Sequence, residues 1–387
     1  MNANITIPVN EPIIPKEAKT YILDALKTGW ISSSGKYIKK FEEKFAKFLG
    51  VKHAVAVSSG TAALHVALLA CGIRKNDEVI VPAFTMAATW MAVIYVGAKP
   101  VFVDCDPDTF NIDVKLIEKK VTERTKAIIP VHIYGYPVDM DPLIKIAKRH
   151  KLTVIEDAAE AHGAEYKGKK CGTMGDIGCF SFYANKIITT GEGGMIVTND
   201  DRLADESRKL KDLYHFPKRF IHSKLGFNYR LTNLQAALGC GQMRHIKEYV
   251  KKKRQMAKRY TSLLQNVSGI KLPHEDKSIK CVYWMFAITV DESKFGMTKD
   301  QLRAKLKLKG IDTRDFFMPP TDQPVLKPYL GRNDKFPNAT LVSESGLYLP
   351  SGLAITQDQI LSVSREIKTL HQRALSSKTA NYPNHGH

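Results

Sequence analysis

The stretch C-F-S-F-Y-A-N-K-I-I-T-T-G-E-G-G-M, residues 179–195, decides how this chain folds and where its chemistry lies. It places Lys186 after the apolar run Cys179–Phe182 and before a turn of threonines and glycines that leads into a second apolar run, Gly194–Val197. Apolar surroundings disfavour the ammonium form of a lysine, and its neutral amine can then attack an aldehyde to form an imine. A solvated surface lysine is the alternative, but the apolar approach and the glycine-rich exit argue against it. We therefore expect Lys186 to be a nucleophilic amine at the end of a buried strand.

Outward from this stretch, residues 10–240 alternate short runs rich in valine and isoleucine with longer amphipathic segments. Strands that alternate with helices in this way build a mostly parallel sheet with helices on both faces. Seven strands are expected: Ala54–Ser58, Glu78–Val81, Pro100–Asp104, Ala127–His132, Thr153–Glu156, Cys179–Phe182 and Gly194–Val197. The fold class is therefore α/β, with a seven-stranded sheet flanked by helices.

The pattern changes after Met243. A long basic helix is expected to about Leu264, followed by a strand over Val282–Val290, a helix over Lys299–Lys309 and a final helix over Gln357–Leu375. This order predicts a smaller α+β domain. We expect a large domain over residues 1–245, a small C-terminal domain over 246–375, and a mobile polar tail over 376–387.

Composition narrows the class of protein. The 387 residues are 44% hydrophobic and 25% charged, and no apolar stretch reaches the roughly 20 residues that cross a bilayer. The N-terminus lacks the pattern of a signal peptide, and the six cysteines form no C-x-x-C pair, so we expect a cytoplasmic protein with reduced thiols and no metal site. The net charge of +19 comes without a nucleic-acid motif, so it favours a small anionic substrate over DNA or RNA.

Two further segments carry polar groups at the ends of expected strands. In S-S-G-T-A-A-L, residues 58–64, a strand is expected to end and a helix to begin near Gly60. The N-terminus of a helix is suited to bind a phosphate; an ordinary capped turn is the alternative. In V-I-E-D-A-A-E-A-H-G, residues 154–163, an apolar strand delivers Glu156 and Asp157 at the edge where open α/β sheets bind ligands. A buried carboxylate there needs a cationic partner, and a protonated pyridine nitrogen is one candidate beside a helix cap or a salt bridge.

Together with G-F-N-Y-R-L-T-N, residues 226–233, these three segments closely resemble the DegT/DnrJ/EryC1/StrS family of nucleotide-sugar aminotransferases. The resemblance covers roughly residues 8–370. It implies the fold type I architecture of aspartate aminotransferase and the cofactor pyridoxal 5′-phosphate, which passes through pyridoxamine 5′-phosphate. By the same resemblance, Lys186 is the Schiff-base lysine and the catalytic residue.

The resemblance also assigns the cofactor-binding residues. Asp157 matches the partner of the pyridine nitrogen, and Glu160 stands near the phenolic oxygen, where the family usually has glutamine. The phosphate cradle matches Gly60, Thr61 and Ser181.

Residues of the neighbouring subunit are implied as well. Asn228 matches a residue that reaches the phosphate from the other chain, which implies a homodimer with shared active sites. Arg230 is expected near an anionic group of the substrate.

The remaining site residues depart from the family or vary within it. Met86 replaces the aromatic residue that commonly follows the threonine of P-x-x-T, and its thioether can pack on the cofactor ring. Trp30, Ser33, Tyr183 and Phe317 are candidate substrate residues. The opening W-I-S-S, the run I-I-T-T-G-E-G-G-M and Glu160 point to the branch of 4-aminotransferases that use GDP-linked sugars. The loop R-D-F-F-M-P-P, residues 314–320, lacks the histidine expected of that branch, which leaves the nucleotide and the sugar open.

The expected reaction moves an amino group from glutamate, which leaves as 2-oxoglutarate, to the C4 ketone of a nucleotide-linked 4-keto-6-deoxyhexose for polysaccharide or glycan synthesis. Amination at C3 or of a cyclitol ketone is the alternative within the family, and a non-catalytic cofactor-binding regulator is the alternative from another class. A dehydratase is disfavoured, because the family's dehydratases carry histidine in place of Lys186.

Overall fold

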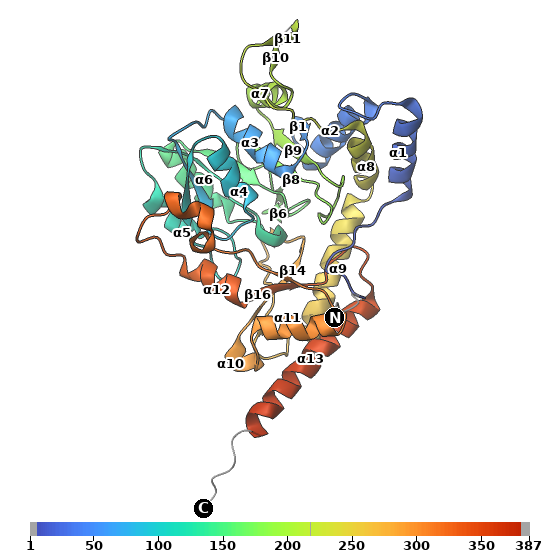
Figure 1. Cartoon of the computed structure of the whole chain (residues 1–387), viewed down its shortest axis with the longest axis vertical. Coiled ribbons are helices and arrows are strands. Elements are labelled where there is room, and N and C mark those ends of the chain that lie inside the picture. The colour runs from blue at the N-terminus through green and yellow to red at the C-terminus, as the bar shows by residue number, and fades with distance from the viewer. Residues whose placement is uncertain (1–5, 217, 381–387) are drawn as a thin grey trace, which may run out of the picture.

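The computed structural model describes residues 6–216 and 218–380, and a seven-stranded sheet forms the centre of its larger part (Figure 1). The strand order is β1-β9-β8-β5-β4-β2-β3, and only β9 runs antiparallel to its neighbours. The strands are β1 His53–Val57, β2 Glu78–Pro82, β3 Lys99–Val103, β4 Thr125–Ile128, β5 Thr153–Asp157, β8 Ile177–Ser181 and β9 Gly194–Thr198. The expected mostly parallel sheet of seven strands is confirmed.

Both faces of this sheet are buried. On β2, Val79 and Val81 belong to one hydrophobic cluster and Ile80 to another on the opposite face. This explains why the strands are runs of apolar residues instead of alternating ones. The covering helices are α1 Lys16–Thr28, α2 Lys36–Leu49, α3 Gly60–Ala70, α4 Ala88–Tyr95, α5 Val114–Ile117, α6 Met140–His150, α7 Asp201–Lys211 and α8 Asn233–Gln242, with the 3₁₀ turns η1 Glu118–Lys120 and η2 Ile133–Gly135.

The C-terminal part follows the long helix α9, Ile246–Leu264, and has its own apolar cluster. Its antiparallel sheet has the order β12-β14-β16-β15, with β12 Ile270–Lys271, β14 Phe286–Val290, β15 Arg314–Asp315 and β16 Gly346–Leu349. Its helices are α10 Glu292–Phe295, α11 Lys299–Leu308, η3 Pro320–Asp322, η4 Pro324–Tyr329, α12 Pro337–Ser345 and α13 Gln357–Ala380. Helix α13 continues beyond its expected end at residue 375; residues 381–387 of the expected tail lie outside the described residues.

The strand expected over Val282–Val290 is shorter in the structure, where β14 begins at Phe286. Residues 282–285 instead bond to a loop of the large part: the Val282 amide donates to the Gly135 carbonyl at 3.1 Å, and the Trp284 amide donates to the Tyr134 carbonyl at 2.9 Å. Apolar character predicted the strand correctly but could not reveal that its first residues pair elsewhere.

The N-terminal segment crosses between the two parts. The Ile7 amide donates to the Gly310 carbonyl at 3.0 Å, and the Ser351 amide donates to the Val9 carbonyl at 2.8 Å. Further along, the Asn10 side-chain amide donates to the Asn185 carbonyl at 3.1 Å, next to Lys186. We call residues 6–13 the N-terminal strap. It joins the C-terminal part to the loop of the expected catalytic lysine, although the sequence grouped these residues with the large domain.

Two small sheets lie at the periphery. One has the order β13-β6-β7, with β6 Glu165–Tyr166, β7 Lys169–Lys170 and β13 Ile279–Lys280. The other is the hairpin of β10, His215–Phe216, and β11, Lys218–His222, which projects beyond α7 in Figure 1. No helix in the described part of the chain is long and apolar enough to span a bilayer.

Candidate active site

Lys186 lies in the tight connection between β8 and β9. The loop is closed by the Thr190 amide, which donates to the Phe182 carbonyl at 2.9 Å, and by the Thr189 hydroxyl, which donates to the same carbonyl at 3.0 Å. The lysine side chain is only 10% exposed, and its Nζ lies 3.6 Å from Glu160 Oε1 and 3.7 Å from the centre of the Trp284 ring. Burial lowers the pKa of Lys186, while the carboxylates of Glu160 and Asp157 oppose this shift. A larger share of the amine is therefore neutral and able to attack a carbonyl carbon.

Asp157 ends β5 and is buried. Its Oδ2 accepts from the Thr89 hydroxyl at 2.8 Å, and its Oδ1 accepts from the Ala159 amide at 3.2 Å. The Thr89 hydroxyl is in turn 2.9 Å from that of Thr85. Burial raises the pKa of Asp157, because a charge away from water is costly. A cation placed against this carboxylate would offset that cost, as a protonated ring nitrogen does.

The other carboxylate of β5 has a different environment. Glu156 is fully buried and accepts from the amides of Gly172, Met174 and Gly175 at 2.7, 2.5 and 2.5 Å. It also lies 3.0 Å from the His132 ring. These contacts use both of its oxygens to hold the loop before β8. Of the two carboxylates that the sequence placed at this strand end, Asp157 is therefore the one left for a ligand.

Glu160 is held by an unusual turn. Tyr134, in η2, has a φ of 53°, and its amide donates to Glu160 Oε2 at 2.7 Å. A positive φ costs free energy for a bulky residue, and the Tyr134 ring is fixed by packing against Trp284 and Phe317. Burial raises the pKa of Glu160 to about 7, although the neighbouring Lys186 opposes this. Near neutral pH this side chain can therefore either donate or accept a proton.

The raised pKa of Glu160 has a consequence for stability. A carboxyl with an ordinary pKa of 4.5 that rises to about 7 on folding binds its proton more tightly in the folded state, so the free energy of unfolding falls as pH rises from about 4.5 to 7. Glu160→Gln removes this titration. We expect the melting temperature of the cofactor-free variant, relative to wild type, to increase between pH 5 and pH 8 in thermal unfolding. The exposed Glu43→Gln is the control, and a difference that stays constant with pH for Glu160→Gln would contradict the raised pKa.

The expected phosphate cradle lies where β1 meets α3. The Ser59 hydroxyl caps the helix by accepting from the Ala62 amide at 3.1 Å, so Gly60 and Thr61 form its first turn. A side chain at Gly60 would stand 2.7 Å from Ser181 Cβ, so only glycine allows β8 and this turn to approach so closely. The N-terminus of α3 and the Ser181 side chain are therefore neighbours, and a helix N-terminus is suited to bind an anion.

Met86, which was expected on the cofactor ring, and two of the expected substrate residues are about half exposed. Met86, Trp30 and Tyr183 are 52, 58 and 47% exposed, and Ser33 is half-buried. Phe317 packs 5.6 Å from the Tyr134 ring and thereby belongs to the wall beside Glu160. Among the described residues, no hydrogen bond or ion pair joins Trp30, Met86 or Ser33 to Lys186.

Asn228 and Arg230 bond to each other. Arg230 Nε and a terminal nitrogen donate to Asn228 Oδ1 at 3.0 and 2.7 Å, and Arg230 pairs with Asp212 at 3.0 Å. The Ser58 amide donates to the Tyr229 carbonyl at 2.8 Å, so this segment runs beside the end of β1. Because Arg230 occupies its oxygen, the exposed Asn228 is left with its amino group as a free donor.

Three residues of the site were missed by the sequence analysis: Trp284, Tyr134 and Thr89. The Trp284 indole also donates to the Asn185 carbonyl at 2.8 Å, which fixes the ring beside Lys186. Trp284 was assigned to an expected strand and was therefore not considered for the site. The sequence gives no indication of Tyr134, because its role depends on its main-chain amide. Thr89 follows the P-x-x-T segment by four residues, the spacing that puts two side chains on one helix face, so it could have been found.

Comparisons with known proteins agree with this geometry. Residues 12–368 match the model of the DegT/DnrJ/EryC1/StrS aminotransferase family. GDP-perosamine synthase of Caulobacter vibrioides is 44% identical over 357 residues, which cover 92% of this chain and 95% of that protein. The solved structure of DesV from S. venezuelae has a TM-score of 0.87 and 34% identity, with 94% of this chain and 100% of that chain covered.

A further solved structure, the PLP form of Spr1654 from Streptococcus pneumoniae, has a TM-score of 0.89 and 25% identity over 96% of this chain and 99% of that chain. The family model spans nearly the whole length of this chain, and the sheet, the buried lysine and the glycine turn agree with it. The chain therefore belongs to the DegT/DnrJ/EryC1/StrS aminotransferase family.

Proposed function

We propose that this enzyme transfers the amino group of glutamate to the C4 ketone of a nucleotide-linked 4-keto-6-deoxyhexose, in the manner of a GDP-perosamine synthase. The protein is a nucleotide-sugar aminotransferase with pyridoxal phosphate as its cofactor. The observation that carries the proposal is the nearly buried side chain of Lys186, which lies between Glu160 and Trp284 and whose pKa is lowered by burial, so that the neutral amine is favoured. The alternatives of C3 or cyclitol amination and of a non-catalytic regulator are not favoured, given 44% identity to a GDP-perosamine synthase.

The residues present fit the cofactor. Gly60, Thr61 and Ser181 would hold its phosphate, and the buried carboxylate of Asp157 would face its ring nitrogen. When bound, pyridoxal phosphate supplies an aldehyde that carries the amino group and a ring that accepts the electrons left by a departing C–H proton.

Side chains of the protein move the protons and orient the cofactor-binding groups. Lys186 would hold the aldehyde and, once released, would take the C–H proton on its Nζ and return it to the carbon on the other side of the substrate nitrogen, which contributes about 10²–10⁴-fold to the rate. Thr89 and the Ala159 amide orient the Asp157 carboxylate. Glu160, with a pKa of about 7, can exchange a proton with a group near Lys186 without leaving its bond to the Tyr134 amide.

The proposed reaction is tested by incubating the holoenzyme and glutamate with GDP-, UDP- and dTDP-linked 4-keto-6-deoxy sugars. We expect mass spectrometry to detect the amino sugar with the GDP-linked substrate and equimolar 2-oxoglutarate. Conversion of a 3-keto sugar instead, with none of the 4-keto sugars aminated, would contradict the proposed position of attack.

We further propose that the functional unit is a homodimer in which Asn228 binds the cofactor phosphate of the partner subunit. The free amino group of Asn228 supports this proposal. Exposed apolar side chains close to it in the sequence support it as well: Leu225 is 90% exposed, and Ile221, on the projecting hairpin, is 54% exposed. Trp30 and Leu26, at the end of α1, are also more than half exposed. Exposed apolar side chains are suited to burial against another chain, and they support the proposed dimer in this sense.

Complementation tests the shared site. Lys186→Ala and Asn228→Asp chains are each expected to be inactive, the latter because a carboxylate repels the phosphate. In mixed dimers one site combines the intact Lys186 of one chain with the intact Asn228 of the other, so we expect activity to return when the variants are mixed. Mixed dimers confirmed by native mass spectrometry but without activity would place Asn228 outside the partner's site.

We also expect the enzyme to work in the cytoplasm. Its six cysteines are all free thiols, five of them buried, as a reducing compartment allows.

A further inference from the structure

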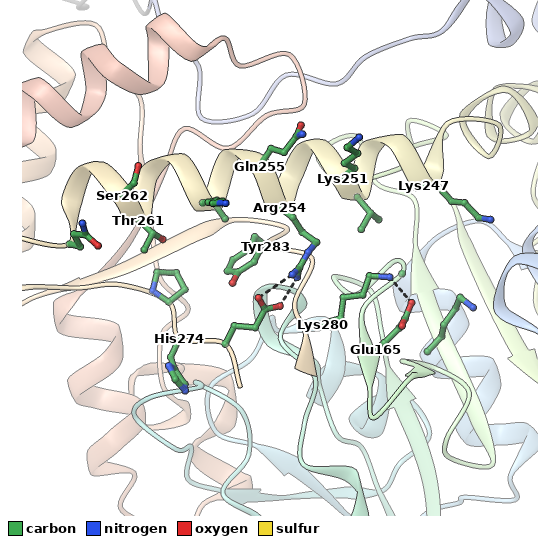
Figure 2. Close-up of a pocket in the computed structure, with 18 of the residues that line it drawn as sticks. Glu165, Lys247, Lys251, Arg254, Gln255, Thr261, Ser262, His274, Lys280 and Tyr283 are labelled. Carbon is green, nitrogen blue, oxygen red and sulfur yellow. Dashed lines mark hydrogen bonds and ion pairs between the residues drawn. The ribbon is translucent and has the colours of Figure 1, made fainter. Parts of the chain in front are cut away.

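A large groove lies between α9 and the small sheet β13-β6-β7, with the segment 273–283 as its floor (Figure 2). Its volume is about 1100 Å³, which is at the upper end of what small-molecule sites enclose. Apolar side chains line part of it, including Phe48, Val250 and Tyr283. Tyr283 is followed by Trp284, which contacts Lys186, so the groove lies behind the active-site segment and shares no side chain with the cofactor cradle.

Positive charge is concentrated in this groove. Helix α9 contributes four cations at spacings of four, three and four residues, which places them on one face of the helix. Two more come from the opposite wall. The cations are Lys247, Lys251, Arg254 and Lys258 on α9, with Lys170 and Lys280 across from them. Figure 2 shows Lys247, Lys251 and Arg254 along the helix and Lys280 beyond them.

The acidic residues of the groove neutralise only two of these cations. Glu275 Oε1 accepts from Arg254 at 2.5 Å, and Glu165 Oε1 accepts from Lys280 at 2.6 Å, as the dashed lines in Figure 2 mark. Within residues 6–216 and 218–380, no carboxylate forms an ion pair with Lys247, Lys251 or Lys258. Both acids of the groove are therefore already paired.

The neighbouring face of the same helix is arranged differently. There Lys252 pairs with Glu248 at 3.0 Å, one turn away, and Glu248 also meets His245. Like charges one turn apart, such as Lys247 and Lys251, destabilise a helix. On the face that lines the groove, Lys247, Lys251 and Lys258 thus have no carboxylate partner among the described residues, which is the arrangement expected where an anion binds.

We propose that this groove is a binding site for a small polyphosphate anion, either inorganic pyrophosphate or the diphosphate of a free nucleotide. The cations from Lys247 to Lys258 extend over about 16 Å of helix, which is longer than one phosphate needs. Lysine serves phosphate as a point charge, and flexible lysine side chains can converge on neighbouring phosphoryl groups. The partly buried ring of Tyr283 lines the groove, would lie beside such an anion, and offers a surface on which a nucleobase can stack.

The test measures binding of inorganic pyrophosphate to the holoenzyme by calorimetry, without keto sugar or glutamate. The variant Lys247→Glu/Lys251→Glu reverses two exposed charges in the groove. The control Lys305→Glu/Lys307→Glu makes the same change of net charge on α11, away from the groove. We expect the groove variant to bind pyrophosphate about tenfold or more weakly than wild type, because each lost attraction is replaced by a repulsion. The control should bind like wild type.

Three outcomes would overturn the proposal: equal binding by all three proteins, equal weakening in both variants, or a change in oligomeric state confined to the groove variant. The last would make the groove a contact between copies of the chain. A second titration with GDP distinguishes the two ligand sources. Tighter binding of GDP than of pyrophosphate, lost in the groove variant, identifies a nucleotide site; equal affinities identify a site for the phosphates alone. Neither titration uses the keto sugar, so failure here is independent of the proposed transamination.

Discussion

Lys186→Ala is expected to abolish turnover while leaving the fold intact. The lysine is needed twice, first to hold the cofactor aldehyde and then to carry the proton, and the variant loses both functions. Steady-state assays should show kcat reduced by about 10⁴-fold, the upper end of what a general acid–base group contributes. The loop stays closed by the bonds of Thr189 and Thr190 to the Phe182 carbonyl, so the melting temperature should change little.

Covalent attachment provides a second readout for this variant. After reduction with borohydride, wild-type protein should carry the cofactor on the peptide that contains Lys186, and Lys186→Ala should carry none. The exposed Lys169→Ala is the matched control and should behave as wild type in both measurements. Activity of Lys186→Ala within tenfold of wild type would refute the role of this lysine.

Asp157→Asn is expected to have the second largest effect. The substitution keeps the size of the side chain but removes the buried negative charge that would face the ring nitrogen. Because that charge favours the transition state electrostatically, kcat should fall by about 10²–10³-fold or more, with the KM for the sugar much less affected. A loss confined to the sugar KM would make Asp157 a substrate ligand instead.

Two companion variants separate charge from orientation. Thr89→Val removes the hydroxyl that donates to Asp157 but leaves the carboxylate, so its kcat should lie between those of wild type and Asp157→Asn. Asp141→Asn removes an exposed carboxylate far from the lysine loop and should leave kcat unchanged. If Thr89→Val reduced kcat as much as Asp157→Asn does, orientation alone would account for the effect.

The sheet could be predicted because its strands are buried on both faces. Runs such as Glu78–Val81 and Gly194–Val197 are too apolar for a surface, and the structure moves their ends by only a residue. The predicted strand ends are further from the observed ones where hydrogen bonds to other parts of the fold replace the pairing between strands. The run expected over Ala127–His132 ends at Ile128 in the structure, because Pro130 cannot donate a ladder bond and His132 enters the turn that packs on Glu156.

The site itself was predictable only in part. Lys186, Asp157 and Gly60 follow strand ends, and a parallel sheet brings such ends together, so their grouping follows from local sequence. Trp284 could not be found this way, since it comes from the C-terminal part and reaches Lys186 only because residues 282–285 pair with the Tyr134 turn. Glu156 and Asp157 also differ in role because three amides from residues 172–175 donate to Glu156. The sequence of β5 alone does not reveal these contacts.

The N-terminal strap links folding to the order in which the chain is synthesised. Ile7 and Val9 bond to Gly310 and Ser351, which are synthesised some 300 residues after them. Asn10, next in line, holds the carbonyl of Asn185 beside the lysine. Contacts between such distant points form late, because the intervening loop must be closed before they contribute. All seven strands of the large sheet precede Gly310 and Ser351 in the sequence, so this sheet can form during translation before the strap meets its partners in the C-terminal part.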